Sequence, residues 1–110
     1  MKGILINPFK KTLTEIINNN IKDVYKELTN KEIGEVNMIE RFPLGPREYL
    51  WLDEEGLFKA QQKRFAIPPL TGFQTFAGIA IILGENQEGD SWCDTKINIE
   101  ELYNSIVWEK

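Results

Sequence analysis

The 110-residue chain contains no histidine and only one cysteine. Histidine is the commonest general base and the commonest metal ligand, so its absence removes every Ser-His or Cys-His nucleophile. A lone cysteine excludes an intrachain disulfide and a cysteine-rich zinc site, and it is typical of a reducing compartment. Trp92 and Asp94 flank Cys93 without a basic neighbour that would lower its pKa. We therefore interpret Cys93 as having no chemical role.

Long apolar runs are also missing. The run at residues 76–83 is about eight residues long, whereas a membrane-spanning helix needs ~20. At the N-terminus, Ile4-Leu5-Ile6 is too short for the core of a signal peptide, and no small-residue cleavage site follows it. We therefore expect a cytoplasmic protein that does not contact a membrane.

Basic residues are outnumbered, with 13 Lys and Arg against 17 Asp and Glu for a net charge of -4. This balance argues against a non-specific DNA-binding protein. Residues 56–75 nevertheless hold Lys59, Lys63 and Arg64 and no acid, whereas residues 76–110 hold two lysines against seven acids. The asymmetry has two interpretations: two differently solvated faces, or a basic patch for an anionic ligand on an acidic body.

The composition itself is globular, with 42% hydrophobic and 27% charged residues. Apolar runs and period-two alternation predict several strands. The segment 76–83 is expected to be the central strand, buried on both faces. The other expected strands are residues 3–6, 12–17 (hairpinned to the first), 35–42 with a possible bulge, 49–52, and a short one at 65–67.

Two segments predict short helices. Residues 21, 24, 25 and 28 form one apolar helical stripe. Asn98 and Glu101 resemble a capping box at the start of a second helix. No repeat, low-complexity tract or linker divides the chain. Residues 1–110 are therefore expected to form one α+β domain, with an antiparallel or mixed sheet of five or six strands and two short helices.

The connecting segments carry turn residues. Two prolines and a glycine predict a stiff loop at residues 42–47. Residues 53–56 end in glycine and predict a hairpin turn, with a return strand that begins at residues 57–58. Pro68-Pro69 and Thr71-Gly72 interrupt the region 59–75, the least regular of the chain.

No catalytic constellation stands out. The acids at 53–55 are explained by turn chemistry, and Glu88, Asp90 and Asp94 lack the spacing of a calcium loop. The glycine-bounded segment 84–89 lacks the lysine and the following helix of a phosphate-binding loop. We therefore expect a protein that is not an enzyme and that uses no metal and no cofactor.

Cations and aromatic residues do occur together in the sequence. Arginine matches phosphate geometry and aromatic rings stack on bases, but the same residues could equally be solvated cations and core aromatics. Trp92 lies in a polar segment, either as an interface anchor or as a ring folded back on the core. The candidate ligand- or partner-binding residues are Arg47, Lys59, Lys63, Arg64 and Trp92. The wider cation and aromatic set adds Arg41, Phe42, Tyr49, Trp51, Phe65 and Phe73.

Four segments carry a family resemblance: residues 1–8, the Leu-Asp-Glu-Glu-Gly-Leu sequence at 52–57, the Gly-Ile-Ala-Ile-Ile-Leu-Gly sequence at 78–84, and the closing helix. Together they resemble a family of small proteins encoded by phages, plasmids and other mobile elements and catalogued as a domain of unknown function. Residues 41–47 and 65–75 fall outside the resemblance. It implies no catalytic residues, and it implies a setting in which small acidic cytosolic proteins commonly bind host factors.

These observations lead to one functional hypothesis and an alternative. The hypothesis is a non-catalytic accessory protein, encoded by a phage or mobile element, that binds a host protein and inhibits a defence system. The alternative is a binder of an anionic small molecule such as a nucleotide signal. No specific nucleic acid is expected as a partner. The many aromatics and an expected edge strand also favour a homodimer or larger ring.

Overall fold

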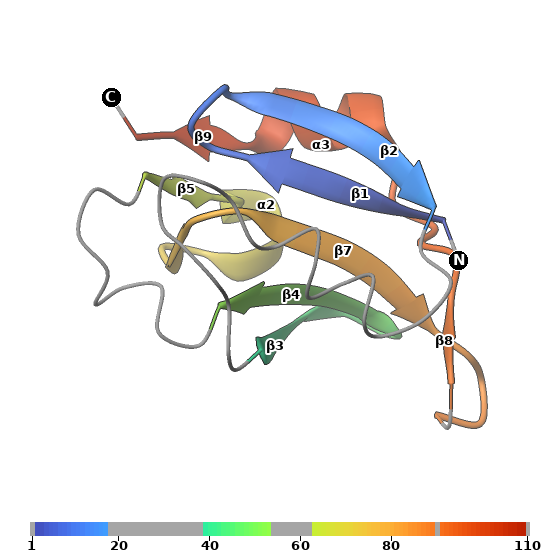
Figure 1. Ribbon diagram of the computed structural model, residues 1–110. Helices are drawn as coiled ribbons and strands as arrows, with labels where there is room; N and C mark the ends of the chain where they lie inside the picture. Colours follow the sequence, from blue (N-terminus) through green and yellow to red (C-terminus); the bar gives the residue numbers. More distant parts are fainter. Residues whose placement is uncertain (1, 18–38, 54–62, 90, 110) are drawn as a thin grey trace.

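The structure is a computed structural model that describes residues 2–17, 39–53, 63–89 and 91–109 (Figure 1). The described strands are β1 Lys2–Asn7, β2 Thr12–Ile17, β3 Ile39–Gly45, β4 Glu48–Asp53, β5 Arg64–Ala66, β6 Thr75–Ala77, β7 Ala80–Glu85, β8 Trp92–Cys93 and β9 Val107–Trp108. The described helices are α2 Pro68–Thr71 and α3 Ile99–Ser105. Two short helices beside a mostly antiparallel sheet of about six strands confirm the predicted α+β class.

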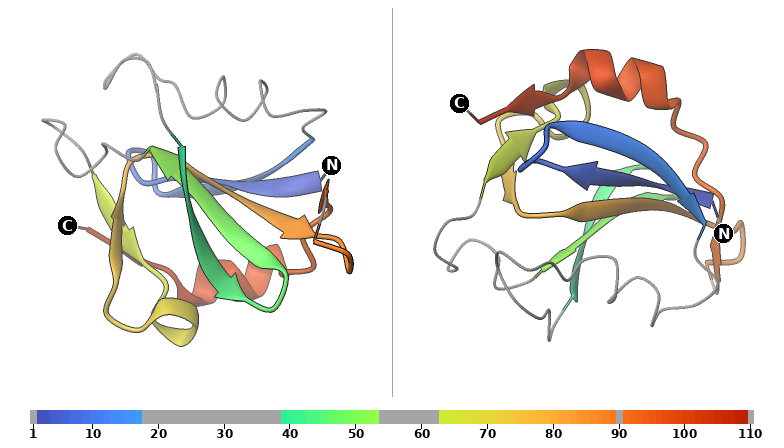
Figure 2. Two further views of the ribbon diagram at one scale, coloured as in Figure 1. Left: turned by 90° about the horizontal axis from the view of Figure 1, so that it is seen from below. Right: turned by 45° about the horizontal axis from the view of Figure 1, so that its top comes forward.

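The strands form two sheets. The large sheet has the order β2-β1-β7-β4-β3, with β8 paired to β7 as its sixth strand. The small sheet has the order β6-β5-β9. The described pairs are antiparallel, and the first two strands form the predicted hairpin with Lys2 opposite Ile17. Figure 2 shows α3 lying along one face of the large sheet, next to β1 and β2.

Strand β7 lies at the centre of the large sheet, between β1 and β4. Its side chains alternate between two apolar clusters: Ile82 belongs to the cluster shared with α3 and the small sheet, and Ile81 belongs to the cluster on the opposite face. Both side chains are fully buried. The prediction of a central strand buried on both faces is confirmed for residues 80–83.

The prediction that this strand begins at residue 76 is wrong. Phe76 and Ala77 belong to β6 of the small sheet, and Gly78 separates the two strands. Gly78 has a φ of 87°, a conformation that glycine adopts without a steric penalty. One apolar run therefore supplies strands to both sheets, because a glycine within it lets the chain change direction.

The predicted loop at residues 42–47 is also wrong for its first part. Strand β3 continues to Gly45, with a register shift between Pro43 and Gly45, and the turn is confined to residues 46–47. β3 is the edge of the large sheet. A proline that cannot donate a ladder hydrogen bond is tolerated there.

The helix predicted from the capping box is confirmed. The Asn98 side-chain Oδ1 accepts hydrogen bonds from the backbone N–H groups of Glu100 (2.9 Å) and Glu101 (3.0 Å), which caps α3. The predicted helix at residues 21–28 and the turn and return strand at 54–58 lie outside the described residues. In the part of the chain that the structure describes, no helix is long and apolar enough to span a membrane.

Candidate functional site

Arg47 and Trp92 both lie at the C-terminal end of β7, Arg47 next to β4 and Trp92 on β8. Trp92 pairs with Glu85, whose backbone N–H donates to the Arg47 carbonyl at 2.9 Å. The exposed Arg47 side chain donates from Nη1 to the Asn86 carbonyl at 2.7 Å. Arg47 therefore ties the β3–β4 turn to the segment that leads from β7 to β8.

Lys63 and Arg64 lie at the opposite end of β7. The Gly78 N–H, two residues before β7, donates to the Lys63 carbonyl at 2.9 Å. At ~3.3 Å per residue, the length of β7 separates this pair from Arg47 and Trp92 by roughly 17 Å. The four described residues of the predicted site thus form two groups instead of one surface. Lys59, the fifth, lies outside the described residues.

The fold also brings an acid to the second group. β5 pairs with β9, so that the Arg64 N–H donates to Glu109 Oε2 at 2.7 Å and the Glu109 N–H donates to the Arg64 carbonyl at 2.9 Å. No acid lies near Lys63 and Arg64 along the sequence, yet a carboxylate from the other end of the chain lies beside Arg64. That carboxylate weakens the positive potential that an anionic ligand would need.

The aromatic side chains of Tyr49, Trp51 and Trp92 form one cluster together with the side chain of Arg41. Trp92 packs edge-to-face on Trp51, with ring centroids 4.5 Å apart, and on Tyr49, with centroids 5.6 Å apart. Trp51 is buried, whereas Tyr49 and Trp92 are half-buried. Trp92 therefore folds back on the core while part of its ring stays accessible.

Arg41 completes this cluster. It lies on β3 directly opposite Trp51 on β4, and its guanidinium carbon is 5.2 Å from the Trp92 ring centroid, 5.8 Å from that of Trp51 and 6.0 Å from that of Tyr49. The side chain is exposed. Contact with three ring systems holds this cation by the attraction between positive charge and π-electrons. We call Arg41, Tyr49, Trp51 and Trp92 the Arg41–aromatic patch.

Backbone contacts fix the position of β8, which carries Trp92. A Cβ atom on Gly84 would lie 2.6 Å from the Asp94 carbonyl oxygen, so only glycine allows β7 and β8 to approach this closely. The Lys2 N–H donates to Asp94 Oδ1 at 2.7 Å, and the Thr95 N–H donates to the Lys2 carbonyl at 2.9 Å. These contacts anchor the segment after Trp92 to β1.

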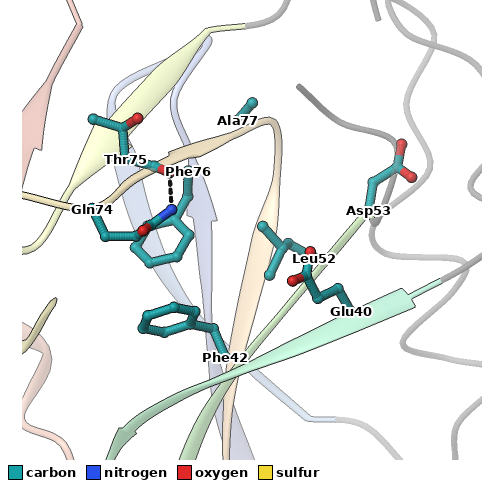
Figure 3. Close-up of a pocket in the computed structure, with 8 residues that line it drawn as sticks. All are labelled: Glu40, Phe42, Leu52, Asp53, Gln74, Thr75, Phe76 and Ala77. Carbon is teal, nitrogen blue, oxygen red and sulfur yellow. Dashed lines mark hydrogen bonds between the residues drawn. The ribbon is translucent and has the colours of Figure 1, made fainter. Parts of the chain in front are cut away.

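A cleft of about 260 Å³ lies on the other face of the β3–β4 hairpin, against β6 (Figure 3). Phe42 and Phe76 pack edge-to-face within its lining, with centroids 5.0 Å apart. Glu40 and Gln74 are exposed lining residues, whereas Phe76 is buried. Figure 3 shows the two phenyl rings on one side of the cleft and Glu40 beside Leu52 on the other.

The sequence prediction did not single out two features of the molecular surface. Arg41 was part of the wider cation and aromatic set, but only the β3–β4 register singles it out, by placing it across from Trp51. Leu70, in α2, is 42% exposed, and Phe73, on the turn that leads from α2 to β6, is fully exposed. Phe73 also belonged to the wider cation and aromatic set, but its exposure was not predicted. Apolar residues among Pro68, Pro69 and Gly72 are the sequence signal that could have identified this turn.

Comparison with known proteins returned no match: no family model fits the chain, and no curated protein and no solved structure is similar to it.

Proposed function

We propose that the protein is a non-catalytic binding protein that engages another protein through the Arg41–aromatic patch. From the mobile-element setting expected from the sequence, we infer that the partner is a protein of the host cell, and we propose inhibition of a host defence system as the biological role. The observation that carries the proposal is the exposed Arg41 guanidinium held over the rings of Tyr49, Trp51 and Trp92.

The residue types of the patch support a protein partner. Tryptophan, tyrosine and arginine are the side chains most enriched among those that dominate the binding energy of protein interfaces. Arg41 is already ordered by its ring contacts, so binding loses less side-chain entropy than it would for a freely rotating arginine. A guanidinium that lies over aromatic rings still has N–H groups that can donate to a carboxylate of the partner.

The anionic small molecule is the weaker candidate. It requires several cations that converge on one ligand, but Lys63 and Arg64 lie at the far end of β7 from Arg47, and Glu109 lies beside Arg64. Calorimetric titration with a panel of mononucleotides and cyclic dinucleotides separates the two functions. Our proposal expects no saturable heat in that panel.

Charge reversal at Arg41 tests the proposal. Immobilised wild-type protein and an Arg41→Glu variant are exposed to host-cell lysate, and the captured proteins are quantified by mass spectrometry. We expect a discrete partner on the wild type and at least a tenfold loss on the variant, which corresponds to about 1.4 kcal/mol. Because Arg41 is exposed, the thermal midpoints of the two proteins should stay close.

Lys10→Glu is the matched control. Lys10 is also exposed, but it lies in the turn between β1 and β2, on the side of the large sheet opposite to β3. The same charge change there should leave capture unaltered. The proposal is wrong if no protein is enriched on the wild type, or if Arg41→Glu captures the partner as well as Lys10→Glu does.

A further inference from the structure

We propose that two copies of this chain form a two-fold dimer in which Phe73 of each copy enters the Phe42–Phe76 cleft of the other. The cleft lies on the face of the β3–β4 hairpin opposite to the Arg41–aromatic patch, since Phe42 packs against one apolar cluster and Tyr49 against the other. The dimer contact is therefore separate from the proposed partner surface and does not depend on it.

Phe73 is the protruding element. Its side chain is fully exposed, and Leu70, three residues earlier in α2, is 42% exposed. Single exposed apolar residues are common on protein surfaces. Phe73 instead exposes a complete phenyl ring and follows three further exposed apolar residues, Pro68, Pro69 and Leu70, in the same short stretch of chain, which makes residues 68–73 an apolar projection. Projections of this kind mark interaction sites.

The turn that carries Phe73 is held in place. The Ile67 carbonyl accepts from the N–H groups of Leu70 and Thr71, both at 2.9 Å, and from the Thr71 hydroxyl at 3.1 Å. The Gly72 N–H donates to the Pro68 carbonyl at 3.0 Å, and the φ of 62° at Gly72 turns the chain toward Phe73. A turn ordered before binding loses little entropy when its tip is buried.

The cleft begins one residue after the projection. Gln74, which follows Phe73, lines the cleft together with Phe76, and Phe42 lines it from β3. Phe73 and the cleft beside it therefore make one surface patch that can bind a second copy of itself. A two-fold axis through such a patch satisfies both contacts at once and closes the assembly at two copies.

The chemistry of the cleft suits a phenyl ring. Phe42 and Phe76 already meet edge-to-face, and a third ring extends that arrangement in the geometry aromatic groups prefer. The volume of about 260 Å³ exceeds that of an engineered apolar cavity of ~150 Å³ that binds benzene, so the cleft has room for one phenyl group. Two carboxylates, the exposed Glu40 and the buried Asp53, also line the cleft. The edge of an aromatic ring is electropositive, so a ring that presents its edge to them is attracted to their charge.

The buried area predicts a weak dimer. Each phenylalanine buries roughly 150–250 Å² and covers a comparable area of cleft, so two symmetric contacts total roughly 600–1,000 Å². Specific stable interfaces usually bury at least ~1,200 Å². We therefore expect a dissociation constant between roughly 1 µM and 1 mM, and a dimer that forms as the protein is concentrated.

Sedimentation equilibrium of the full chain across ~0.1 µM to ~1 mM tests the dimer, because this range begins below the lowest dissociation constant that we expect. We expect the mass to rise from 12.8 kDa toward twice that value. Phe73→Ser, which removes the projection, should stay at the monomer mass over the whole range. Glu40→Trp, which fills the cleft from an exposed strand position, should also stay monomeric. Concentration-dependent NMR shifts of wild-type amides should concentrate at residues 40–42 and 73–77.

Tyr103→Ser is the matched control, because it removes an aromatic ring that is 57% exposed on α3 and does not line the cleft. Its self-association should equal that of the wild type. A wild-type mass that stays at 12.8 kDa, or equal weakening by Phe73→Ser and Tyr103→Ser, refutes the dimer. A mass that climbs beyond two copies refutes the two-fold exchange and indicates an open chain of copies.

Discussion

At the scale of single residues, Arg47 occupies a backbone conformation that side chains with a Cβ atom rarely adopt. Its φ is 62°, at the second position of the two-residue turn between β3 and β4. Glycine is the usual residue at such a position, and another residue costs roughly 1–2 kcal/mol. The Arg47 side chain, through its bond to the Asn86 carbonyl, offsets part of this cost. Arg47 therefore makes a contact between the β3–β4 turn and the segment after β7 that glycine at this position could not make.

Two substitutions separate the backbone cost from the side-chain contact. Arg47→Ala keeps the strained conformation and loses the bond to Asn86, whereas Arg47→Gly loses the same bond and relieves the strain. We expect Arg47→Gly to unfold with a free energy about 1 kcal/mol higher than that of Arg47→Ala in urea denaturation. Equal stability of the two variants, or a more stable alanine variant, would contradict the left-handed conformation at this turn.

At the scale of elements, local patterns located most of the described strands. Alternation identified the segment that became β2, aromatic content identified the one that became β4, and the capping box identified α3. The two errors, the start of β7 and the end of β3, arose where one local pattern is compatible with two structures. Gly78 could lie within a strand or divide it, and Pro43 could end a strand or lie on an edge. Only the pairing of β6 with β5, and the edge position of β3, decide between them.

The candidate site was less predictable for a similar reason. Trp92 reaches Trp51 only because β8 pairs with β7, and Glu109 reaches Arg64 across 45 residues only because β9 pairs with β5. Such contacts depend on strand order, which single-sequence periodicity does not contain. Residue types could therefore be predicted for the surface, but not which of them would meet.

The central position of β7 gives a direct test at this scale. Ile81→Asp places a charge at a fully buried position that packs among Trp51 and Leu83. An unpaired buried charge should lower the free energy of unfolding by at least ~3 kcal/mol, measured in urea. Thr14→Asp, the same new side chain at an exposed position of β2, should change it by less than ~1 kcal/mol. A stable Ile81→Asp variant would mean that β7 is not a buried central strand.

At the scale of the whole molecule, the β3–β4 hairpin separates two surfaces. Residues 41, 49 and 51 face the Arg41–aromatic patch, and residues 40 and 42 face the cleft that we propose to receive Phe73. The hairpin keeps this division because successive side chains of a strand point to opposite faces. The proposed dimer through the cleft would therefore leave both copies of the patch accessible, so it would offer two binding surfaces to the proposed partner.

Bivalence makes a prediction that neither surface makes alone. On a sensor densely coated with the captured partner, the wild-type dimer can hold two partner molecules, and its dissociation is slowed because the second contact is intramolecular. Phe73→Ser keeps the patch, so its dissociation from a sparse coating should equal that of the wild type. When the proteins are injected above the dimer dissociation constant, Phe73→Ser should dissociate from a dense coating at least ~10-fold faster than the wild type, since bivalent gains commonly reach 10²–10⁴.

Tyr103→Ser is the control and should behave as the wild type on both coatings. Equal dissociation of Phe73→Ser and wild type from the dense coating would mean that the two patches of a dimer do not bind partners together. Faster dissociation of Phe73→Ser from the sparse coating would mean that Phe73 contacts the partner itself.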